Sequence, residues 1–292
     1  MQEANCICGS SSSTVLWDKS QREANGILRS VVIRAPDGSI IHGRNVFCNN
    51  CGLVYITPRM SQDELDHFYR HDYRKIYYNG SKEGEAIHAR HAYSLLKEVG
   101  MVTANHLDVG CSTGALIALT GGCGIEPNEE HYAIAKEKGL NVQCTTVEEY
   151  EGGPFELITM MNALEHVADP VAVLTKLRSL LTGNGRVMVS VPNLYGKVVN
   201  LPPDVFLSNA HLYNFGEATL TALFLRCGLR PVALAKVIES IGEKLYMLSK
   251  KAKPAEVTPS FSLDDVSATQ KHLEVWDQVW LMKEYIKKSG FI

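Results

Sequence analysis

From residue 106 onward, short apolar runs of strand length alternate with amphipathic segments of helical length. This alternation predicts a parallel sheet joined by crossover helices, because each β-like run is followed by a helix that can cover the sheet. The expected strands are 106–109, 123–126, 142–145, 156–161 and 186–191, the expected helices are 128–138, 170–181 and 217–227, and two later β-like runs are 232–237 and 244–248. We therefore expect an α/β fold with a seven-stranded, mostly parallel sheet.

The chain is expected to divide into four parts. Residues 1–60 would form a small N-terminal β module, and residues 61–105 a helical lid or connector. Residues 106–250 would form the α/β core, and residues 251–292 a linker with a final helix. A Pro-Asp-Gly turn signal at 36–38 separates two β-branched runs and predicts a hairpin in the first part. Ser61 and Glu64 form a capping-box pattern, which predicts the start of a helix in the second.

The final segment, 263–288, carries an apolar stripe at helical spacing. Val266, Leu273, Trp276 and Trp280 lie on this stripe. A stripe of this width needs a partner surface. Packing on the chain's own core and formation of a homodimer through this helix would both supply one.

A turn of small residues follows the first expected strand and precedes a helix. Gly110, Ser112 and Gly114 let the backbone approach a nucleoside closely, and a helix start offers free N–H groups. The Gly-x-x-x-Gly spacing differs from the Gly-x-Gly-x-x-Gly pattern of dinucleotide sites. Glu126 ends the next strand, 18 residues after Asp108, where a carboxylate can accept both hydroxyls of a ribose. The spacing therefore argues against NAD as the first choice, and the loop with Glu126 predicts a bound nucleoside at this edge of the sheet.

These motifs, with the Glu165-His166-Val167 stretch and the run 183–193, resemble the class I S-adenosylmethionine-dependent methyltransferases over about residues 106–250. The resemblance implies a Rossmann-like fold and S-adenosylmethionine as cofactor. It implies cofactor contacts from Asp108, Gly110, Ser112, Gly114, Glu126, Pro127, Thr146, Val147 and Asn162. In that family pattern the glycine loop lines the methionine end, the acid after the second strand holds the ribose, and the residues after the third strand flank the adenine.

The segment between Gly114 and Gly124 is shorter than the family usually has there. Either the helix and the strand within it are both shortened, or the loop is distorted. The affinity for S-adenosylmethionine depends on which of the two holds.

Four of the eight cysteines form two close pairs within the first 51 residues. Cys48-Asn-Asn-Cys51-Gly is a knuckle that turns two thiolates toward one point, and Cys6-Ile-Cys8-Gly supplies a second pair at a less usual spacing. Four thiolates would close a structural Zn²⁺ site and leave no open position for catalysis. Free thiols and redox chemistry are the alternatives.

The paired knuckles and the Tyr-Arg repeats that follow them resemble a methyltransferase subgroup with a zinc-ribbon-like leader. Members of that subgroup act on sugars, polysaccharide precursors and other small metabolites. The resemblance implies a small-molecule acceptor of this kind, methylated on oxygen or carbon.

Methyl transfer to a hydroxyl requires a base, and histidine suits that role. His166 follows the fourth core strand and His211 follows the fifth, where the family builds its acceptor pocket, although each could be a hydrogen-bonded structural residue. Tyr73 and Tyr213 are expected beside the acceptor. Tyr73 belongs to an aromatic stripe at i, i+4 and i+8 within 69–77, which packs in the core or forms a lid.

The net charge of −3 supplies no basic excess for binding a polyanion. An RNA methyltransferase that uses the ribbon as a clamp is therefore the second hypothesis, and a catalytically silent S-adenosylmethionine-binding module is the third. The N-terminal residues lack a basic region followed by an apolar stretch, and no window approaches the ~18 uninterrupted apolar residues of a membrane span. We expect a cytoplasmic enzyme with a small-molecule acceptor, no membrane partner and no nucleic-acid partner.

Overall fold

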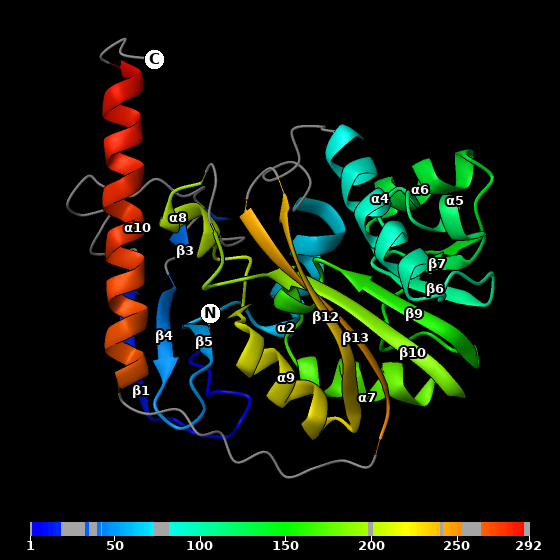
Figure 1. Ribbon diagram of the computed structural model, residues 1–292, viewed down its shortest axis with the longest axis horizontal. Coiled ribbons are helices and arrows are strands. Elements are labelled where there is room, and N and C mark those ends of the chain that lie inside the picture. Colours follow the sequence, from blue (N-terminus) through cyan, green and yellow to red (C-terminus); the bar gives the residue numbers. More distant parts are fainter. Residues whose placement is uncertain are drawn as a thin grey trace.

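The computed structural model describes residues 2–18, 33–34, 40–41, 43–72, 82–197, 201–239, 242–252 and 264–288. Its centre is a seven-stranded sheet with the order β12-β13-β10-β9-β6-β7-β8 (Figure 1). In that order the strands cover Leu229–Glu239, Gly242–Lys251, Leu181–Pro192, Phe155–Met161, His106–Val109, Cys123–Ile125 and Val142–Gln143. Only β13 runs antiparallel to its neighbours within this sheet of the described chain, which confirms the predicted α/β fold.

The strand order puts a reversal of the chain path beside β6. The chain passes outward from β6 to β7 and β8, then crosses to the other side of β6 and continues as β9 and β10. Ligands of open α/β sheets bind outside the carboxyl ends of the strands at such a reversal. The fold therefore brings the glycine loop after β6 and the segment after β9 to one crevice.

Helices cover both faces of the sheet (Figure 1). They include α4 (Lys82–Glu98), α5 (Ile117–Thr120), α6 (Glu129–Glu137), α7 (Pro170–Ser179) and α9 (Glu217–Arg226). Leu157 and Met188 belong to the cluster under α4, whereas Ile158 and Val187 belong to the cluster under α7 and α9, so successive strand residues face opposite layers. In the part of the chain that the structure describes, no helix is both long and apolar enough for a bilayer.

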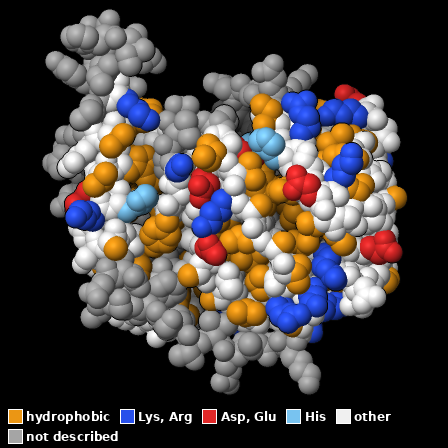
Figure 2. All heavy atoms as spheres, in the orientation of Figure 1, with side chains coloured by type: hydrophobic (Ala, Val, Ile, Leu, Met, Phe, Trp, Pro, Cys, Tyr) orange, Lys and Arg blue, Asp and Glu red, His pale blue; other side chains and the backbone are white. Residues whose placement is uncertain are grey.

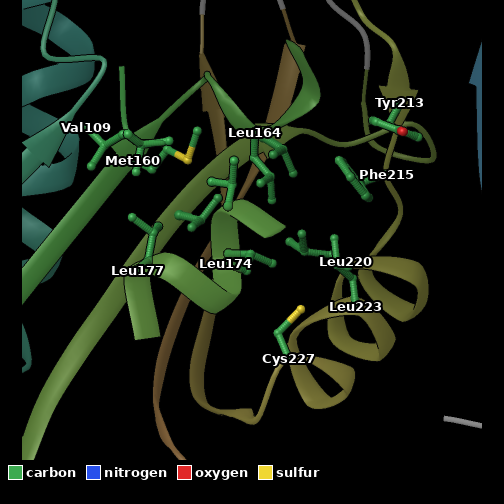
Figure 3. Packing of buried hydrophobic residues seen from close by; sticks show 14 of the residues in the cluster. Val109, Met160, Leu164, Leu174, Leu177, Tyr213, Phe215, Leu220, Leu223 and Cys227 are labelled. Atoms are coloured by element: carbon green, nitrogen blue, oxygen red, sulfur yellow. The ribbon is translucent and has the colours of Figure 1, made fainter. Parts of the chain in front are cut away.

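The larger core lies on the α7–α9 face. Figure 3 shows Leu174 and Leu177 of α7, Leu220 and Leu223 of α9, and Met160 of β9 within this cluster. α7 begins as predicted, since Asp169 accepts the first free N–H groups of the helix at 2.9 and 3.0 Å. Packing on this face fixes the start of α7 and the segment between β9 and α7, which borders the crevice.

The short segment before β7 forms a four-residue helix, α5, and β7 itself has three residues. Both elements are thus shortened, which is the first of the two predicted alternatives. The N–H groups of Gly110 and Cys111 both donate to the Ile125 carbonyl, at 2.9 and 3.0 Å. These bonds close the glycine loop onto β7 despite the short connection.

The N-terminal residues form a four-stranded sheet with the order β1-β4-β5-β11. Its strands cover Ser13–Asp18, Arg44–Cys48, Val54–Thr57 and Tyr213–Asn214. The last of these comes from the predicted core region, so the four-stranded sheet combines N-terminal strands with one strand from residues 106–250, and the domain boundaries stay predictions. β2 (Ile33–Arg34) pairs antiparallel with β3 (Ile40–Ile41), as the predicted hairpin requires, while its turn at 36–38 lies outside the described residues.

α10 (Asp264–Lys288) stands beside the N-terminal sheet, at the left of Figure 1. Leu273 and Trp276 are buried in one cluster with Trp17 of β1 and Phe206 of α8 (Pro203–Phe206). The apolar stripe therefore packs on the chain itself. Hydrophobic side chains also lie along the visible side of this helix (Figure 2), and Val275 and Val279 are 49% and 46% exposed. A homodimer through this helix stays a prediction.

Candidate functional site

A cavity of about 720 Å³ opens at the carboxyl edge of the seven-stranded sheet. Loops after β6, β7, β8, β9 and β10 line it, together with residues of α2 (Gln62–His67), η1 (Phe68–Asp72), α4 and α8. The predicted site residues on its wall are Gly110, Ser112, Glu126, Pro127, Thr146, Val147, Asn162, His166 and His211. One cavity therefore holds the predicted cofactor crevice and the predicted acceptor histidines.

Glu126 follows β7 and is buried, with 7% of its surface exposed. Its Oε2 accepts the Ser112 N–H at 2.8 Å, and its Oε1 accepts the Asn128 N–H at 2.9 Å. Burial raises the pKa of Glu126 to about 7, against the effect of these two bonds. The carboxylate is fixed at the cavity wall, and its remaining lone pairs can accept further hydrogen bonds.

The glycine loop is strained and held by side chains. Gly110 has φ 69°, which suits glycine, and Ser112 has φ 50°, which is costly for a residue with a Cβ. The Ser112 hydroxyl donates to Glu85 of α4, and the Thr113 hydroxyl donates to the same carboxylate at 2.6 Å. The Glu85 carboxylate thus fixes the glycine loop to α4. Nothing in the sequence spacing pointed to Glu85, because the contact depends on how α4 packs.

Two predicted cofactor residues lie outside the cavity wall. Asp108 is 4% exposed beneath the loop, where its Oδ1 accepts the Thr159 hydroxyl at 2.5 Å. Gly114 has φ 82°, and a Cβ there would lie 2.3 Å from Leu140 Cδ1. Their positions indicate support of the loop instead of the direct cofactor contact that the resemblance implies.

Asp108 makes stability depend on pH. Burial raises the pKa of this carboxyl to about 7, so the folded chain binds its proton more tightly than the unfolded chain does. The free energy of unfolding is therefore expected to fall as pH rises from about 4 to about 7, by on the order of 3 kcal/mol. Asp108→Asn should remove part of this fall in urea unfolding across that window, and Asp63→Asn on an exposed part of α2 should leave it intact. An unchanged slope for Asp108→Asn would contradict the assignment.

The two predicted substrate tyrosines have different outcomes. Tyr213 is 1% exposed and its hydroxyl donates to the Ala168 carbonyl at 2.8 Å, on the far side of the segment that borders the cavity. It therefore does not line the cavity, contrary to expectation, because its strand is held by the N-terminal sheet. Tyr73 lies outside the described residues. Tyr69, from the same predicted stripe, does line the cavity.

His166 and His211 lie together, with ring centroids 4.9 Å apart. Nδ1 of His166 lies 2.8 Å from the Ala210 carbonyl, and Nδ1 of His211 lies 2.9 Å from the Phe206 carbonyl. A carbonyl can only accept, so we assign the proton of each neutral ring to Nδ1, which leaves a lone pair on Nε2. The Tyr69 hydroxyl donates to the Ala210 carbonyl at 3.0 Å and also lies 3.0 Å from His166 Nδ1, where it can accept the same proton. The pair has the tautomer that a proton acceptor needs.

Glu165 completes the group beside the histidines. One ligand atom from each of Glu165, His166 and His211 lies within 4.8 Å of the others. Glu165 is 2% exposed, and its Oε2 has no hydrogen-bond partner. Burial raises the pKa of the Glu165 carboxyl, while the charges of His166 and Lys244 oppose that rise. The lone pairs of the Glu165 carboxylate and of the two histidine rings could accept a hydroxyl proton or coordinate a cation. The Glu165-His166-Val167 motif alone does not indicate this role for Glu165, which depends on the contact with His211 in the fold.

A buried ion pair borders the same end of the cavity. Lys244 of β13 lies 2.9 Å from Glu239 of β12. His88 and His91 of α4 also contact the Glu239 carboxylate, and the Tyr246 hydroxyl donates to it at 2.5 Å. This cluster fixes α4 to the edge of the sheet. The sequence pattern does not reveal this cluster, because its members come from α4, β12 and β13 and meet only in the folded chain.

The four N-terminal cysteines form the second group that could hold a metal. Their sulfur atoms lie within 4.8 Å of one another, with Cys6 to Cys51 at 3.4 Å and Cys8 to Cys48 at 3.6 Å. In a regular tetrahedron, sulfurs about 2.3 Å from Zn²⁺ lie about 3.8 Å apart. The cluster therefore fits the predicted Cys₄ site in composition and spacing.

Comparison with known proteins agrees with this geometry. A family model for the methyltransferase domain matches residues 73–234, which is more than half of the chain. The chain belongs to the class I S-adenosylmethionine-dependent methyltransferases. Both the N-terminal sheet, apart from β11, and α10 lie outside the matched region of this methyltransferase.

Individual relatives match shorter stretches. Ubiquinone biosynthesis O-methyltransferase from Marinobacter nauticus is 33% identical over an alignment of 113 residues, and the alignment covers 33% of this chain and 48% of that protein. The Escherichia coli O7:K1 protein of the same name is 34% identical over an alignment of 112 residues, which covers 34% of this chain and 47% of that protein. The chain thus spans about half the length of the curated relatives it matches.

Solved structures show the same fold. The 1,6-didemethyltoxoflavin-N1-methyltransferase from Burkholderia thailandensis, which holds S-adenosylhomocysteine, aligns with a TM-score of 0.54 at 20% identity, over 69% of this chain and 95% of that one. Magnesium protoporphyrin IX methyltransferase from Synechocystis aligns with a TM-score of 0.52 at 16% identity, over 66% and 100%. Both likenesses concern the fold alone.

Proposed function

We propose that this methyltransferase transfers a methyl group from S-adenosylmethionine to a hydroxyl group of a small-molecule acceptor. The observation that carries the proposal is the single cavity that joins the Glu126 crevice to the histidine pair. The relatives that are named O-methyltransferases support oxygen as the accepting atom.

The crevice residues suit an S-adenosyl group. The Glu126 carboxylate would accept the two ribose hydroxyls, while Thr146 and Val147 would flank the adenine and Gly110 would leave room at the methionine end. Asn162 has φ 50° and a buried Oδ1 without a hydrogen-bond partner, so it would gain a bond from a ligand donor there. When bound, the cofactor supplies an electrophilic methyl group on a sulfonium.

His166 is proposed as the general base. Its Nε2 would take the proton of the acceptor hydroxyl, and the Glu165 carboxylate, 3.8 Å from Nε2, would stabilise the resulting imidazolium. His211 would orient the same hydroxyl from the other ring. Nδ1 of His166 stays bonded to the Ala210 carbonyl throughout, so the ring holds its orientation.

The acceptor end of the cavity has a largely apolar wall. Its apolar members are Leu65, Val167, Ala168, Leu201, Val205 and Phe206. This wall favours a hydroxylated acceptor with an apolar or aromatic face. A sugar or polysaccharide precursor is the second candidate, favoured by the buried, unpartnered oxygens of Asn162 and Glu165, which would accept bonds from additional hydroxyls.

The test is a methyl-transfer assay with labelled S-adenosylmethionine and two acceptor panels, phenols and nucleotide sugars. We expect label on the oxygen of a phenol, at a rate that added Mg²⁺ or Mn²⁺ leaves unchanged. Label only on a nucleotide sugar would select the second candidate. Label on carbon, or no calorimetric binding of S-adenosylhomocysteine at millimolar concentration, would overturn the proposal.

We also propose that the four cysteines hold Zn²⁺ as a structural ion. The four sulfur atoms come from two knuckles and converge within 4.8 Å of one another, which is the arrangement that a tetrahedral Cys₄ site needs. Metal analysis of the purified protein should give one zinc per chain, and loss of that zinc in a Cys48→Ser variant would support these ligands. Retention of zinc in the variant would refute them.

A further inference from the structure

The segment that carries His211 is a strand of the N-terminal sheet. β11 pairs antiparallel with β5, Tyr213 opposite Tyr55 and Asn214 opposite Val54. One residue closer to His211, the Ile56 N–H donates to the Leu212 carbonyl at 3.0 Å. The backbone next to His211 is therefore held by β5, a strand that lies some 150 residues earlier in the sequence.

The same segment orients both histidines. The Ala210 carbonyl, directly before His211, accepts Nδ1–H of His166 at 2.8 Å. His211 itself bonds the Phe206 carbonyl. A displacement of 210–212 would thus change the orientation of both rings and the Nδ1–H tautomer that the two carbonyls impose.

The cysteine cluster lies at the other end of the strand that holds this segment. Cys48 ends β4, and β5 begins three residues after Cys51. The Cys48 N–H donates to the Leu53 carbonyl at 2.9 Å, and the Gly52 N–H donates to the Cys48 carbonyl at 2.9 Å, so the knuckle is also the turn of the β4–β5 hairpin. β5 then spans about 10 Å from Val54 to Thr57, and its Ile56 N–H holds the Leu212 carbonyl next to His211.

Side chains supply a second connection between the N-terminal residues and the histidine segments. Arg59, just after β5, donates to the Tyr213 hydroxyl at 2.8 Å and to the Ala168 carbonyl at 3.3 Å. Tyr213 in turn donates to the same carbonyl at 2.8 Å. Ala168 lies two residues after His166 and lines the cavity. The segments of both histidines are therefore tied to the residues around β5.

From these contacts we propose that the metal-loaded cysteine cluster positions the His166–His211 pair through β5, β11 and Arg59, and does not act on the cofactor crevice. Zinc would make the β4–β5 hairpin rigid, and the hairpin would hold the 210–212 segment. Cys48, Cys51, Arg59 and Tyr213 are then positioning residues. The inference rests on the proposed zinc site and, for the role of the histidines alone, on the proposed methyl transfer; the geometry of the two histidines depends on neither.

The test reads the imidazole nitrogens of protein labelled with ¹⁵N-histidine by NMR. Zinc-loaded protein should show the Nδ1–H tautomer for the neutral rings of His166 and His211. In Cys51→Ser, both rings should lose this signature and give the tautomer mixture of a free imidazole. His106, bonded to Thr120 and Thr159 in the core, should be unchanged, as should all rings in the matched control Cys144→Ser, which alters an exposed cysteine.

Tyr213→Phe provides a second variant that keeps the ring and the zinc ligands. It should retain zinc and still shift the His166 signals, because the link from Arg59 to Ala168 loses its hydroxyl. In both variants the affinity for S-adenosylhomocysteine should stay within about twofold of the wild type, as expected for distant independent sites.

Three results would overturn the inference: histidine signals unchanged on zinc loss, histidine signals unchanged in Tyr213→Phe, or loss of S-adenosylhomocysteine binding in parallel with the histidine changes. The last would mean that zinc holds the whole fold. Failure of the proposed function appears separately, as zinc-loaded wild type that does not bind S-adenosylhomocysteine at all.

Discussion

Exchange of Glu126 for glutamine is expected to weaken S-adenosylhomocysteine binding about a hundredfold. Both carboxylate oxygens already accept a backbone N–H, from Ser112 and Asn128, so a glutamine must turn its amide donors toward one of them. The variant also loses charge-assisted bonds to two ribose hydroxyls, each worth about 1.5–3 kcal/mol. At about 1.4 kcal/mol per tenfold, a loss of this size is readily measured by calorimetry.

Glu129→Gln is the matched control, since Glu129 is an exposed acid in the first turn of α6. A 2′-deoxy analogue of the ligand supplies a double-mutant cycle, because its missing hydroxyl should matter less in Glu126→Gln than in the wild type. Equal losses in both proteins would mean that Glu126 does not contact the ribose.

The same carboxylate gives a pH dependence of binding. Burial holds the pKa of Glu126 at about 7 in the free protein, and only the ionised form accepts two ribose hydroxyls. The wild-type affinity is therefore expected to rise from about pH 6 to about pH 8, whereas Glu126→Gln should show a flat profile. A wild-type profile as flat as that of the variant would contradict this role.

Removal of the proposed base should lower the rate of methyl transfer strongly and leave ligand binding almost unchanged. His166→Ala is expected to lower the rate of methyl transfer about 10²–10⁴-fold, the usual contribution of a positioned general base. Binding of S-adenosylhomocysteine should stay within about twofold, because the glycine loop and Glu126 are untouched. The measurement is formation of S-adenosylhomocysteine with the acceptor found in the panels.

His272→Ala is a suitable control, because His272 lies on α10 and bonds the Leu194 carbonyl away from the cavity. A His166→Ala enzyme that keeps its rate within about tenfold of the wild type would exclude proton transfer through this ring. In that case His211 or a deprotonated acceptor must carry the chemistry.

The sheet and its crevice were predictable because they depend on local patterns. The strand at 106–109 and the acid at 126 follow from an apolar run and its spacing, and helix starts such as Asp169-Pro170 follow from capping. β8 is shorter than predicted and ends at Gln143, since only two of its residues pair with the short β7. The family resemblance then connected these elements to one cofactor.

The support around the crevice could not be predicted, because it depends on tertiary contacts. β11 has two residues, and neither marks a strand until β5 is placed beside it. The sequence pattern shows Glu85 only as one of several charged residues on an amphipathic helix, and Lys244 only as a polar residue at the end of a strand. In the fold, both border the cavity. Tyr213 was predicted to lie beside the acceptor because it belongs to the segment after the fifth core strand, but pairing with β5 places its hydroxyl on the Ala168 carbonyl.

The most direct test is a crystal structure of the protein soaked with S-adenosylhomocysteine. The ligand's sugar is predicted to lie over the end of β7, with both hydroxyl oxygens within hydrogen-bond distance of Glu126 and the sulfur directed toward His166 and His211. Density for the ligand at another place on the protein, or a nucleoside in the crevice whose hydroxyls do not meet Glu126, would contradict this account.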